Sequence, residues 1–303
     1  MIKNPIINEL KKLKLINKSD FNIISNTTRD KKIRVIKDKK SKIIFLEKFA
    51  SNKNYYKYLR YNDNDRKNID KIKKITKVKT LTGIVKTPLI DDDVRRFNQF
   101  KNFLKNKEIL DFGCGWGGFL NKIKNAKSIN GVELRVECID YIKNKFKKIK
   151  IFNNLDLVTK KFDIITAFHV LEHIPYQINT LKLLKSKLKN NGRIIIEVPH
   201  AEDFLILQDE LKEFKKFTFW SEHLVLHTHT SLKKVLQQSG FKNIKIKYLQ
   251  RYNFANHLGW FLKKKPGGHN SYANITSYNL NKEYKNNLVR LGQTDTLIAE
   301  ANI

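Results

Sequence analysis

The sequence predicts an α/β fold, in which a doubly wound sheet of seven strands follows a small α+β appendage at the amino end. From about residue 101 onward, apolar runs alternate with helical patterns, as expected for parallel strands joined by crossover helices. The run at 193–199 shows no polar alternation, which is typical of a strand buried on both faces. A chain of 303 residues is long enough to bury one large domain with such an appendage.

Each element of the main domain has its own signal. We expect strands at 107–112, 128–134, 149–154, 162–168, 193–199, 243–249 and 295–303. Apolar residues at helical spacing predict helices at 118–125, 136–148, 178–192 and 231–241. The last two helices are expected to stop at Gly192 and Gly240, because glycine commonly ends a helix.

The first 100 residues follow a different pattern. Residues 31–49 predict two strands around a Lys-Asp-Lys-Lys turn, and residues 55–75 predict a tyrosine-bearing helix. We therefore expect residues 1–100 to form an appendage that packs on a main domain of residues 101–303. Between the last two strands of that domain, the long stretch at about 251–292 is expected to form a lid, because long connections are usually functional.

Composition predicts a cytoplasmic protein. No apolar stretch approaches the roughly 18 residues that span a bilayer, and the lysine-rich opening lacks the apolar block of a secretory signal. The two cysteines, Cys114 and Cys138, outline neither a disulfide nor a zinc framework. The formal net charge of +32 favours phosphate-bearing partners, but lysines are spread along the whole chain, as a compositional bias would also produce.

The stretch ILDFGCGWGG places a glycine-rich turn directly behind the first strand of the main domain. Such a turn points backbone N–H groups at a ligand, and its glycines allow a close approach. The turn has the G-x-G-x-x-G spacing of a dinucleotide-binding turn, formed by Gly113, Gly115 and Gly118. It also has a G-x-G-x-G spacing, in which Gly117 takes the place of Gly118. Glu133 ends the second strand 20 residues after Gly113, where an acid can bind both hydroxyls of a ribose.

Asp111, two residues before the first glycine, distinguishes the possible cofactors. A carboxylate at this position would repel a pyrophosphate and would stabilise a cationic cofactor with a free amino group. Together with GVEL and FDIITAFHVLEHI, the stretch ILDFGCGWGGFL resembles the class I S-adenosylmethionine-dependent methyltransferases, and the resemblance covers residues 101–303. It implies a Rossmann-like seven-stranded sheet with an antiparallel last strand, S-adenosylmethionine as cofactor, and methyl transfer.

The resemblance also implies a role for each position of the cofactor site. The glycine turn would wrap the methionine part, and Glu133 would hold the ribose. Asn154 or Leu155 would flank the adenine, and Phe168 would lie near the methionine moiety. The cofactor-binding residues expected on this basis are Asp111, Gly113, Cys114, Gly115, Gly117, Glu133, Asn154, Leu155 and Phe168.

The segment HVLEHI follows the fourth strand and places His169 at the carboxyl edge of the sheet, where ligands bind in this architecture. Glu172 and His173 of the same segment are equally well explained as a structural hydrogen-bonded pair. His169 is therefore the candidate for the acceptor pocket.

A second histidine cluster follows the fifth strand. Glu222 and His223 match a Glu-His pair of saccharide methyltransferases. A hydroxyl acceptor needs a base and histidine titrates near neutral pH, so His223 is the first candidate base and His169 the second. Glu222 is the third predicted catalytic residue, as the partner of His223. His227 and His229 follow at spacings that could suit zinc, but no supporting ligand beyond Glu222 is evident, so no metal is expected.

The resemblance thus implies a methyltransferase that acts on a small molecule, namely a saccharide or its nucleotide- or lipid-linked form, including phosphate-bearing ones. Two other classes stay open. The charge favours an RNA methyltransferase, although no Asn-Pro-Pro-Tyr-like segment, catalytic cysteine pair or RNA-binding module is evident, so nucleic-acid binding is expected to be nonspecific. A non-catalytic cofactor-binding protein is the other class, and the intact Asp111, glycine turn and Glu133 argue against it.

Overall fold

The computed structural model describes residues 2–17, 20–49, 78–80, 83–85 and 91–303. The helix predicted at 55–75 lies outside these residues. The chain divides into two compact units. The first unit comprises residues 1–50, 168–186 and 193–303, and the second comprises residues 51–167 and 187–192.

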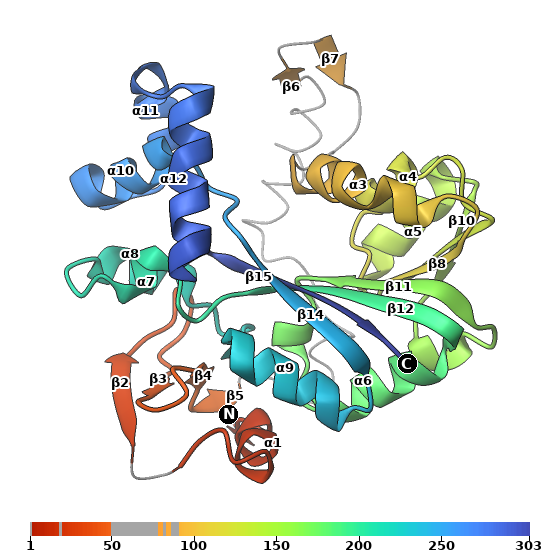
Figure 1. Cartoon of the computed structure of the whole chain (residues 1–303), viewed down its shortest axis with the longest axis horizontal. Coiled ribbons are helices and arrows are strands. Elements are labelled where there is room, and N and C mark those ends of the chain that lie inside the picture. Colours follow the sequence, from red (N-terminus) through yellow and green to blue (C-terminus); the bar gives the residue numbers. More distant parts are fainter. Residues whose placement is uncertain (1, 18–19, 50–77, 81–82, 86–90) are drawn as a thin grey trace. The chain divides into compact units, whose positions relative to one another are not determined.

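The main sheet has seven strands in the order β10-β9-β8-β11-β12-β15-β14 (Figure 1). Their bounds are β8 (Glu108–Phe112), β9 (Ser128–Val132), β10 (Ile149–Phe152), β11 (Phe162–Phe168), β12 (Leu188–Pro199), β14 (Lys242–Leu249) and β15 (Thr296–Asn302). Strand β8 is parallel to β9 and β11, whereas β15 is antiparallel to β12 and β14. The predicted seven-stranded α/β fold with an antiparallel last strand is confirmed.

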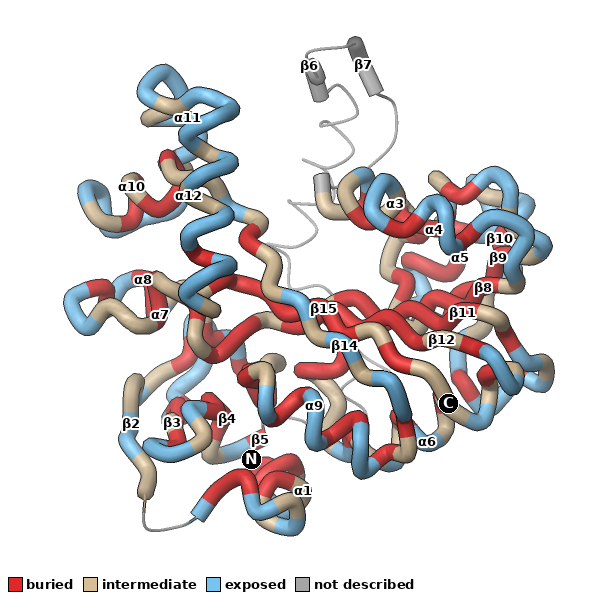
Figure 2. Tube along the Cα trace, in the orientation of Figure 1, coloured by how far each residue is buried: buried red, intermediate tan, exposed pale blue. Residues whose placement is uncertain are grey.

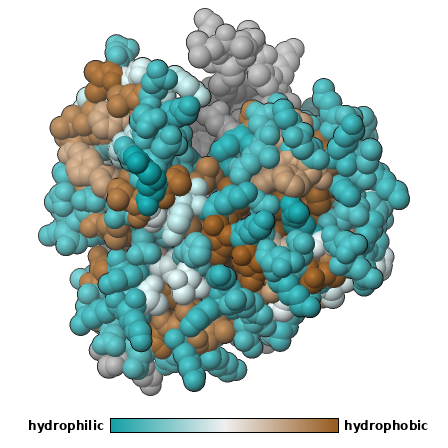
Figure 3. Space-filling model, viewed as in Figure 1, coloured by the Kyte–Doolittle hydropathy of each residue, from teal (hydrophilic) through white to brown (hydrophobic). Residues whose placement is uncertain are grey.

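The central strands are buried along most of their length, as Figure 2 shows for β11, β12 and β15. This burial explains why their sequences are nearly continuous apolar runs. Side chains on the outside are different: the face seen in Figure 3 is hydrophilic over most of its area.

The helices predicted at 118–125 and 136–148 end three residues early, and a third differs more. The helix predicted at 178–192 stops at Ser186, and β12 begins two residues later. In the extended segment the ammonium group of Lys189 lies 2.8 Å from Glu108 and 3.0 Å from Asp163. Strand pairing and these ion pairs override the helical propensity of a lysine- and leucine-rich segment.

The second unit carries three described helices, a single turn of 3-10 helix and a short hairpin. Their bounds are α3 (Asp91–Leu104), α4 (Gly118–Lys122), α5 (Val136–Lys145), η1 (Leu155–Leu157), β6 (Val78–Thr80) and β7 (Gly83–Val85). Helix α3 packs against α4. The predicted domain boundary between residues 100 and 101 falls inside α3.

In the first unit, an N-terminal sheet has the strand order β13-β4-β3-β2. Its bounds are β2 (Phe21–Ser25), β3 (Val35–Asp38), β4 (Ile44–Leu46) and β13 (Val225–Leu226), and nearby lie β1 (Ile2–Lys3), β5 (Lys48–Phe49) and α1 (Ile6–Lys12). The strand pair predicted within 31–49 is present as β3 and β4. Strand β13 comes from far along the chain and pairs with β4, which the sequence pattern did not indicate.

The remaining elements of the first unit are mostly helical. They are η2 (Leu171–His173), α6 (Gln177–Ser186), α7 (Phe204–Leu207), α8 (Lys212–Thr218), α9 (His229–Gln238), α10 (Phe254–Lys263), α11 (Gly268–Ser271), η3 (Ala273–Ile275) and α12 (Tyr278–Leu291). Helix α9 packs on β14 and β15, and the stretch predicted as a lid forms α10 to α12. Among the described residues, no helix combines the length and the apolar character needed to cross a membrane.

Candidate functional site

The glycine-rich turn between β8 and α4 adopts left-handed backbone conformations. The φ angle is +76° at Gly113, +55° at Gly115 and +75° at Gly117, where a side chain would be strained. The N–H groups of Gly113 and Cys114 donate to the carbonyl oxygen of Val132, at 2.8 and 3.1 Å. Burial raises the pKa of the Cys114 thiol, which is therefore unreactive. The turn is thus held at the carboxyl end of β9.

Asp111 lies in β8 directly before this turn and is 4% exposed. The hydroxyl group of Thr166 donates to its Oδ1 at 2.7 Å. Burial raises the pKa of Asp111 to about 7; Asp93 and Glu133 also raise it, while Arg96 lowers it. A cationic ligand bound beside Asp111 would stabilise its ionised form.

Glu133 follows β9, and both of its carboxylate oxygens accept hydrogen bonds. Oε2 accepts from the N–H of Gly115 at 2.9 Å, and Oε1 accepts from the N–H of Leu134 at 2.9 Å. The guanidinium group of Arg135 donates to both oxygens at 3.2 Å. Burial alone would raise the pKa of Glu133, but the bonds from Arg135 hold it below the ordinary value. The carboxylate is therefore ionised, and a ribose would have to replace Arg135.

Asn154 and Leu155 lie after β10, close to Glu133 in the structure. The N–H of Glu133 donates to the carbonyl oxygen of Phe152 at 3.0 Å, so the ends of β9 and β10 are joined. Asn154 accepts from the N–H of Asp156 at 3.1 Å and caps η1, while Leu155 is buried. The structure therefore brings these two predicted residues to the same edge of the second unit as Glu133.

Two polar residues of α3 belong to this region but were not predicted. Asp93 and Arg96 are both buried, and their side chains lie 3.7 Å apart. Asp93 packs so closely on the turn that a Cβ atom at Gly118 would overlap its carboxylate. The sequence did contain a signal for this pair, because Asp93 and Arg96 are an acid and a base one helical turn apart, just before the first strand. The predicted domain boundary concealed it.

In the first unit, Phe168 ends β11 and is buried, and His169 follows it with a φ of +53°, which is uncommon for a residue other than glycine. Nδ1 of His169 lies 3.2 Å from Glu172, and Nε2 lies 3.2 Å from Glu197. Burial alone would lower the pKa of His169, but the bonds to Glu172 and Glu197 raise it. His169 thus has a buried carboxylate within 3.2 Å of each ring nitrogen, which fixes the orientation of the ring.

Glu172 is the centre of a compact cluster with His173 and His223. One ligand atom from each of the three residues lies within 4.8 Å of the other two. Glu172 is 0% exposed, and its Oε2 has no hydrogen-bond partner among the described residues. Burial alone would raise its pKa, but His169 and His173 lower the pKa of Glu172 to about 2. The cluster therefore contains a buried carboxylate with an unsatisfied oxygen.

The two histidines of this cluster face each other with ring centroids 4.9 Å apart. Nδ1 of His173 lies 3.1 Å from the carbonyl oxygen of Glu222. Burial, and next the charge of His173, lower the pKa of His223 to about 3. His223 is therefore neutral near pH 7 and keeps a nitrogen lone pair.

His227 and His229 lie elsewhere, although their spacing to His223 is short. His227 is buried between the side chains of Ser231 and Gln177, at 3.0 and 2.9 Å. His229 stacks on Tyr248, with ring centroids 5.7 Å apart. The residues that join His223 are instead Glu172 and His173, 50 residues upstream.

The N-terminal sheet holds the segment that carries His223. The buried amide group of Asn4 donates to the carbonyl oxygens of Leu46 and Leu224, at 2.9 and 2.8 Å. The N–H of Leu224 in turn donates to the carbonyl oxygen of Glu172 at 2.8 Å. The appendage predicted at the amino end is therefore part of the framework of the histidine cluster.

Asp30 fixes the part of the same segment that precedes His223. Its carboxylate accepts from the N–H of Ser221 at 3.0 Å and from the hydroxyl group of Ser221 at 2.5 Å. The guanidinium group of Arg29 lies 4.6 Å from the centre of the Trp220 ring. These contacts position the backbone directly before Glu222.

The sequence profile of the methyltransferase domain family matches residues 87–246, which is more than half of the chain. The chain belongs to this methyltransferase family. The matched part of the methyltransferase contains the glycine turn, Asp111, Glu133 and the cluster around Glu172.

Named relatives of the methyltransferase differ in what they act on. The ubiquinone biosynthesis O-methyltransferase of Coxiella burnetii is 33% identical over 101 residues, which are 30% of this chain and 43% of that protein. The tRNA U34 carboxymethyltransferase of Nautilia profundicola is 27% identical over 203 residues, covering 59% and 66%. A solved SAM-dependent methyltransferase from Archaeoglobus fulgidus superposes with a TM-score of 0.47 and 21% identity, covering 69% and 92%. The chain spans about half the length of the curated relatives that it matches first.

The histidine cluster of the methyltransferase has the ligand types of a divalent-metal site. Two imidazoles and one carboxylate form a common catalytic zinc set. Ligand atoms of a tetrahedral zinc site lie about 3.3 Å apart, whereas Nε2 of His173 and Oε1 of Glu172 are 3.9 Å apart. The three side chains would therefore have to move closer together to hold an ion.

Proposed function

We propose that the chain transfers a methyl group from S-adenosylmethionine to a hydroxyl group of a small molecule, of the saccharide class or its nucleotide- or lipid-linked form. Asp111 carries the proposal for the cofactor, because it is a buried acid with a pKa of about 7 directly behind the glycine turn. A cationic cofactor with a free amino group would stabilise its charge, whereas a pyrophosphate would be repelled.

Eight of the nine predicted cofactor-binding residues lie in the second unit, and Phe168 lies in the first. The turn from Gly113 to Gly117 would bind the methionine part through its N–H groups, and Glu133 would accept from the ribose once Arg135 has moved away. Asn154 and Leu155 would flank the adenine. When bound, S-adenosylmethionine supplies an electrophilic methyl group.

For the acceptor, we infer that Glu172, His173 and His223 hold a divalent cation that lowers the pKa of the acceptor hydroxyl group. The unsatisfied oxygen of Glu172 supports this role. His223 as a general base is the alternative. A histidine with a pKa of about 3 is a weak base, and His169 has a carboxylate close to each of its ring nitrogens.

Calorimetry tests the cofactor assignment directly. The full chain should bind S-adenosylhomocysteine and S-adenosylmethionine, and it should bind NAD more weakly. Tighter binding of NAD would refute the proposed cofactor.

An RNA acceptor is the second candidate, because the net charge is +32 and one relative is named as a tRNA U34 carboxymethyltransferase. Labelled S-adenosylmethionine should be offered with a panel of saccharides and, separately, with total tRNA. We expect label in the saccharide fraction. Sequence-selective incorporation into RNA at physiological salt would replace the small-molecule proposal.

A further inference from the structure

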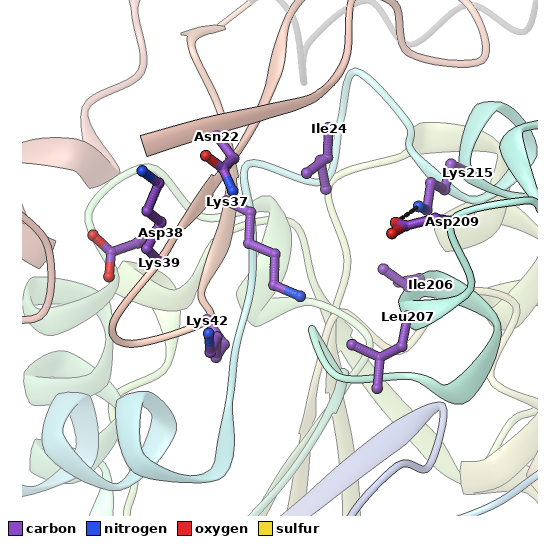
Figure 4. Close-up of a pocket in the computed structure, with 10 residues that line it drawn as sticks. All are labelled: Asn22, Ile24, Lys37, Asp38, Lys39, Lys42, Ile206, Leu207, Asp209 and Lys215. Atoms are coloured by element: carbon purple, nitrogen blue, oxygen red, sulfur yellow. Dashed lines mark hydrogen bonds and ion pairs between the residues drawn. The ribbon is translucent and has the colours of Figure 1, made fainter. Parts of the chain in front are cut away.

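A cavity of about 210 Å³ lies in the first unit, between the N-terminal sheet and helices α7 and α8 (Figure 4). Lysines supply most of its charged lining, and three aliphatic side chains supply the apolar part. The charged and apolar residues are Lys37, Asp38, Lys39, Lys42, Asp209, Lys215, Ile24, Ile206 and Leu207. Figure 4 shows the side chain of Lys37 extending from β3 toward Ile206 and Leu207.

Lys37 is the most informative of these residues. Its side chain is half-buried, and among the described residues its ammonium group has no hydrogen-bond or ion-pair partner. Burial lowers its pKa, and the charges of Lys42 and Lys215 lower it further, whereas the charges of Glu202 and Asp209 raise it. A partly desolvated ammonium group without a hydrogen-bond or ion-pair partner is costly, and an anion bound beside it would offset this cost.

Hydrogen bonds to Asp38 fix the backbone of the neighbouring turn, which carries two of the other lining lysines. Oδ2 of Asp38 accepts from the N–H groups of Lys40 and Ser41, at 3.1 and 2.7 Å, so this carboxylate closes the turn. Figure 4 shows it directed away from the ammonium group of Lys37. Lys42 ends the turn with a φ of +62°, and its N–H donates to the carbonyl oxygen of Asp38 at 3.0 Å.

Lys215 closes the opposite side of the cavity from α8. It is only 9% exposed, and its ammonium group uses one donor on Asp209, at 3.2 Å. Asp209 itself is fully exposed to solvent. Lys215 therefore keeps donors for a second acceptor.

We propose that this cavity binds the phosphate group of a small phosphorylated molecule, with Lys37, Lys42 and Lys215 as its ligands. Four lysines and two carboxylates line the cavity, and Glu202 is a further charge that acts on Lys37, so positive charge is in excess and favours an anion. Sites for drug-sized ligands span about 300–1,000 Å³, and a cavity of about 210 Å³ suits a single headgroup better. The apolar wall lowers the local dielectric and strengthens the attraction. This site is independent of the proposed methyl transfer.

The test uses the full chain with inorganic phosphate and glycerol 3-phosphate, titrated by calorimetry at an ionic strength kept constant with sodium chloride. We expect saturable binding of both probes, and a loss of about tenfold or more in affinity for Lys37→Met and for Lys42→Gln. Lys234→Gln, which removes an exposed lysine of α9, is the matched control and should bind as the unchanged protein does. Added phosphate should raise the melting temperature of the unchanged protein and of Lys234→Gln, but not that of Lys37→Met.

Three results would overturn the proposal. The first is that chloride displaces phosphate at equal ionic strength, and the second is that Lys234→Gln loses as much affinity as Lys37→Met, because net charge would then explain the binding. The third is saturable, Lys37-dependent binding of a single-stranded RNA without binding of either phosphate probe, which would assign the cavity to a nucleic-acid backbone.

Discussion

Nδ1 of His173 lies 3.1 Å from the backbone carbonyl oxygen of Glu222. Because a carbonyl group only accepts hydrogen bonds, Nδ1 carries a proton, and in the neutral ring Nε2 keeps its lone pair. Nε2 lies 3.9 Å from the buried carboxylate of Glu172. A ring nitrogen oriented by a carbonyl group on its other side is the usual arrangement of a metal-binding histidine.

This geometry predicts metal binding. Zn²⁺ or Mn²⁺ should bind the chain with one ion per molecule, and His173→Ala should lower the affinity by about a hundredfold or more, because one of three protein ligands is lost. Calorimetry with each ion measures the affinity. His229→Ala, a change at the histidine that stacks on Tyr248, is the control. If neither ion binds, His223 returns to the role of general base.

His223→Ala should lower the rate of methyl transfer by about a hundredfold or more and hardly change cofactor affinity, because the residue acts on the acceptor. Single-turnover transfer and a cofactor titration of the same variant separate the two effects. His269→Ala, at an exposed histidine of α11, is the control. Full activity of His223→Ala would move the role to His169, and equal losses of rate and cofactor binding would make His223 structural.

Asp111 should make stability and cofactor binding depend on pH. Its pKa is raised from 3.8 to about 7 in the folded chain, so its stabilising contribution is complete below pH 3.8 and is lost as the pH rises through about 7. Relative to the unchanged protein, Asp111→Asn should therefore gain stability over this interval, by at most about 1.4 kcal/mol per pH unit. Urea unfolding at several pH values measures the difference, and parallel curves would contradict the shift.

The same carboxylate should strengthen cofactor binding as it ionises. Affinity for S-adenosylhomocysteine, which keeps the cationic amino group, should rise from pH 6 to pH 8 in the unchanged protein and stay nearly flat in Asp111→Asn. Calorimetry at each pH gives both profiles. A rise of the same size in the variant would place the amino group elsewhere.

Glu133→Gln should weaken cofactor binding by about tenfold to a hundredfold, because a charge-assisted pair of hydrogen bonds to the ribose is lost. The bonds from Gly115 and Arg135 are weakened as well, so a thermal melt must show that the fold persists. Glu137→Gln, at an exposed position of α5, is the control. Unchanged affinity of Glu133→Gln would show that the ribose binds to other residues.

Asn4→Ala should destabilise the first unit by about 1–3 kcal/mol, because the buried carbonyl groups of Leu46 and Leu224 lose their shared donor. Denaturant unfolding measures the loss. Asn8→Ala, at an exposed position of α1, is the control. The proposed metal affinity should fall in the Asn4 variant as well, since Leu224 is bonded to Glu172, and a variant that loses neither stability nor metal binding would show that Asn4 does not hold this segment.

The local sequence pattern was sufficient to predict the strands of the main sheet and the glycine turn. All seven strands of the main sheet were predicted, because each buried strand is an uninterrupted or alternating apolar run. The glycine turn was equally readable, since positive φ angles at Gly113, Gly115 and Gly117 leave few residue types possible. The roles of Asp111 and Glu133 remain predictions, but their placement beside the turn follows from the strands that carry them.

Only the tertiary structure decided which residues surround His223. Short spacing suggested His227 and His229, yet Glu172 and His173 are its neighbours, because β13 pairs with β4 and Leu224 bonds to Glu172. The same holds for Asp93, which reaches the glycine turn from α3, and for the lysines that line the cavity of the first unit. Periodicity along a chain reports which face of an element is buried, whereas contacts between distant segments depend on how those faces pack.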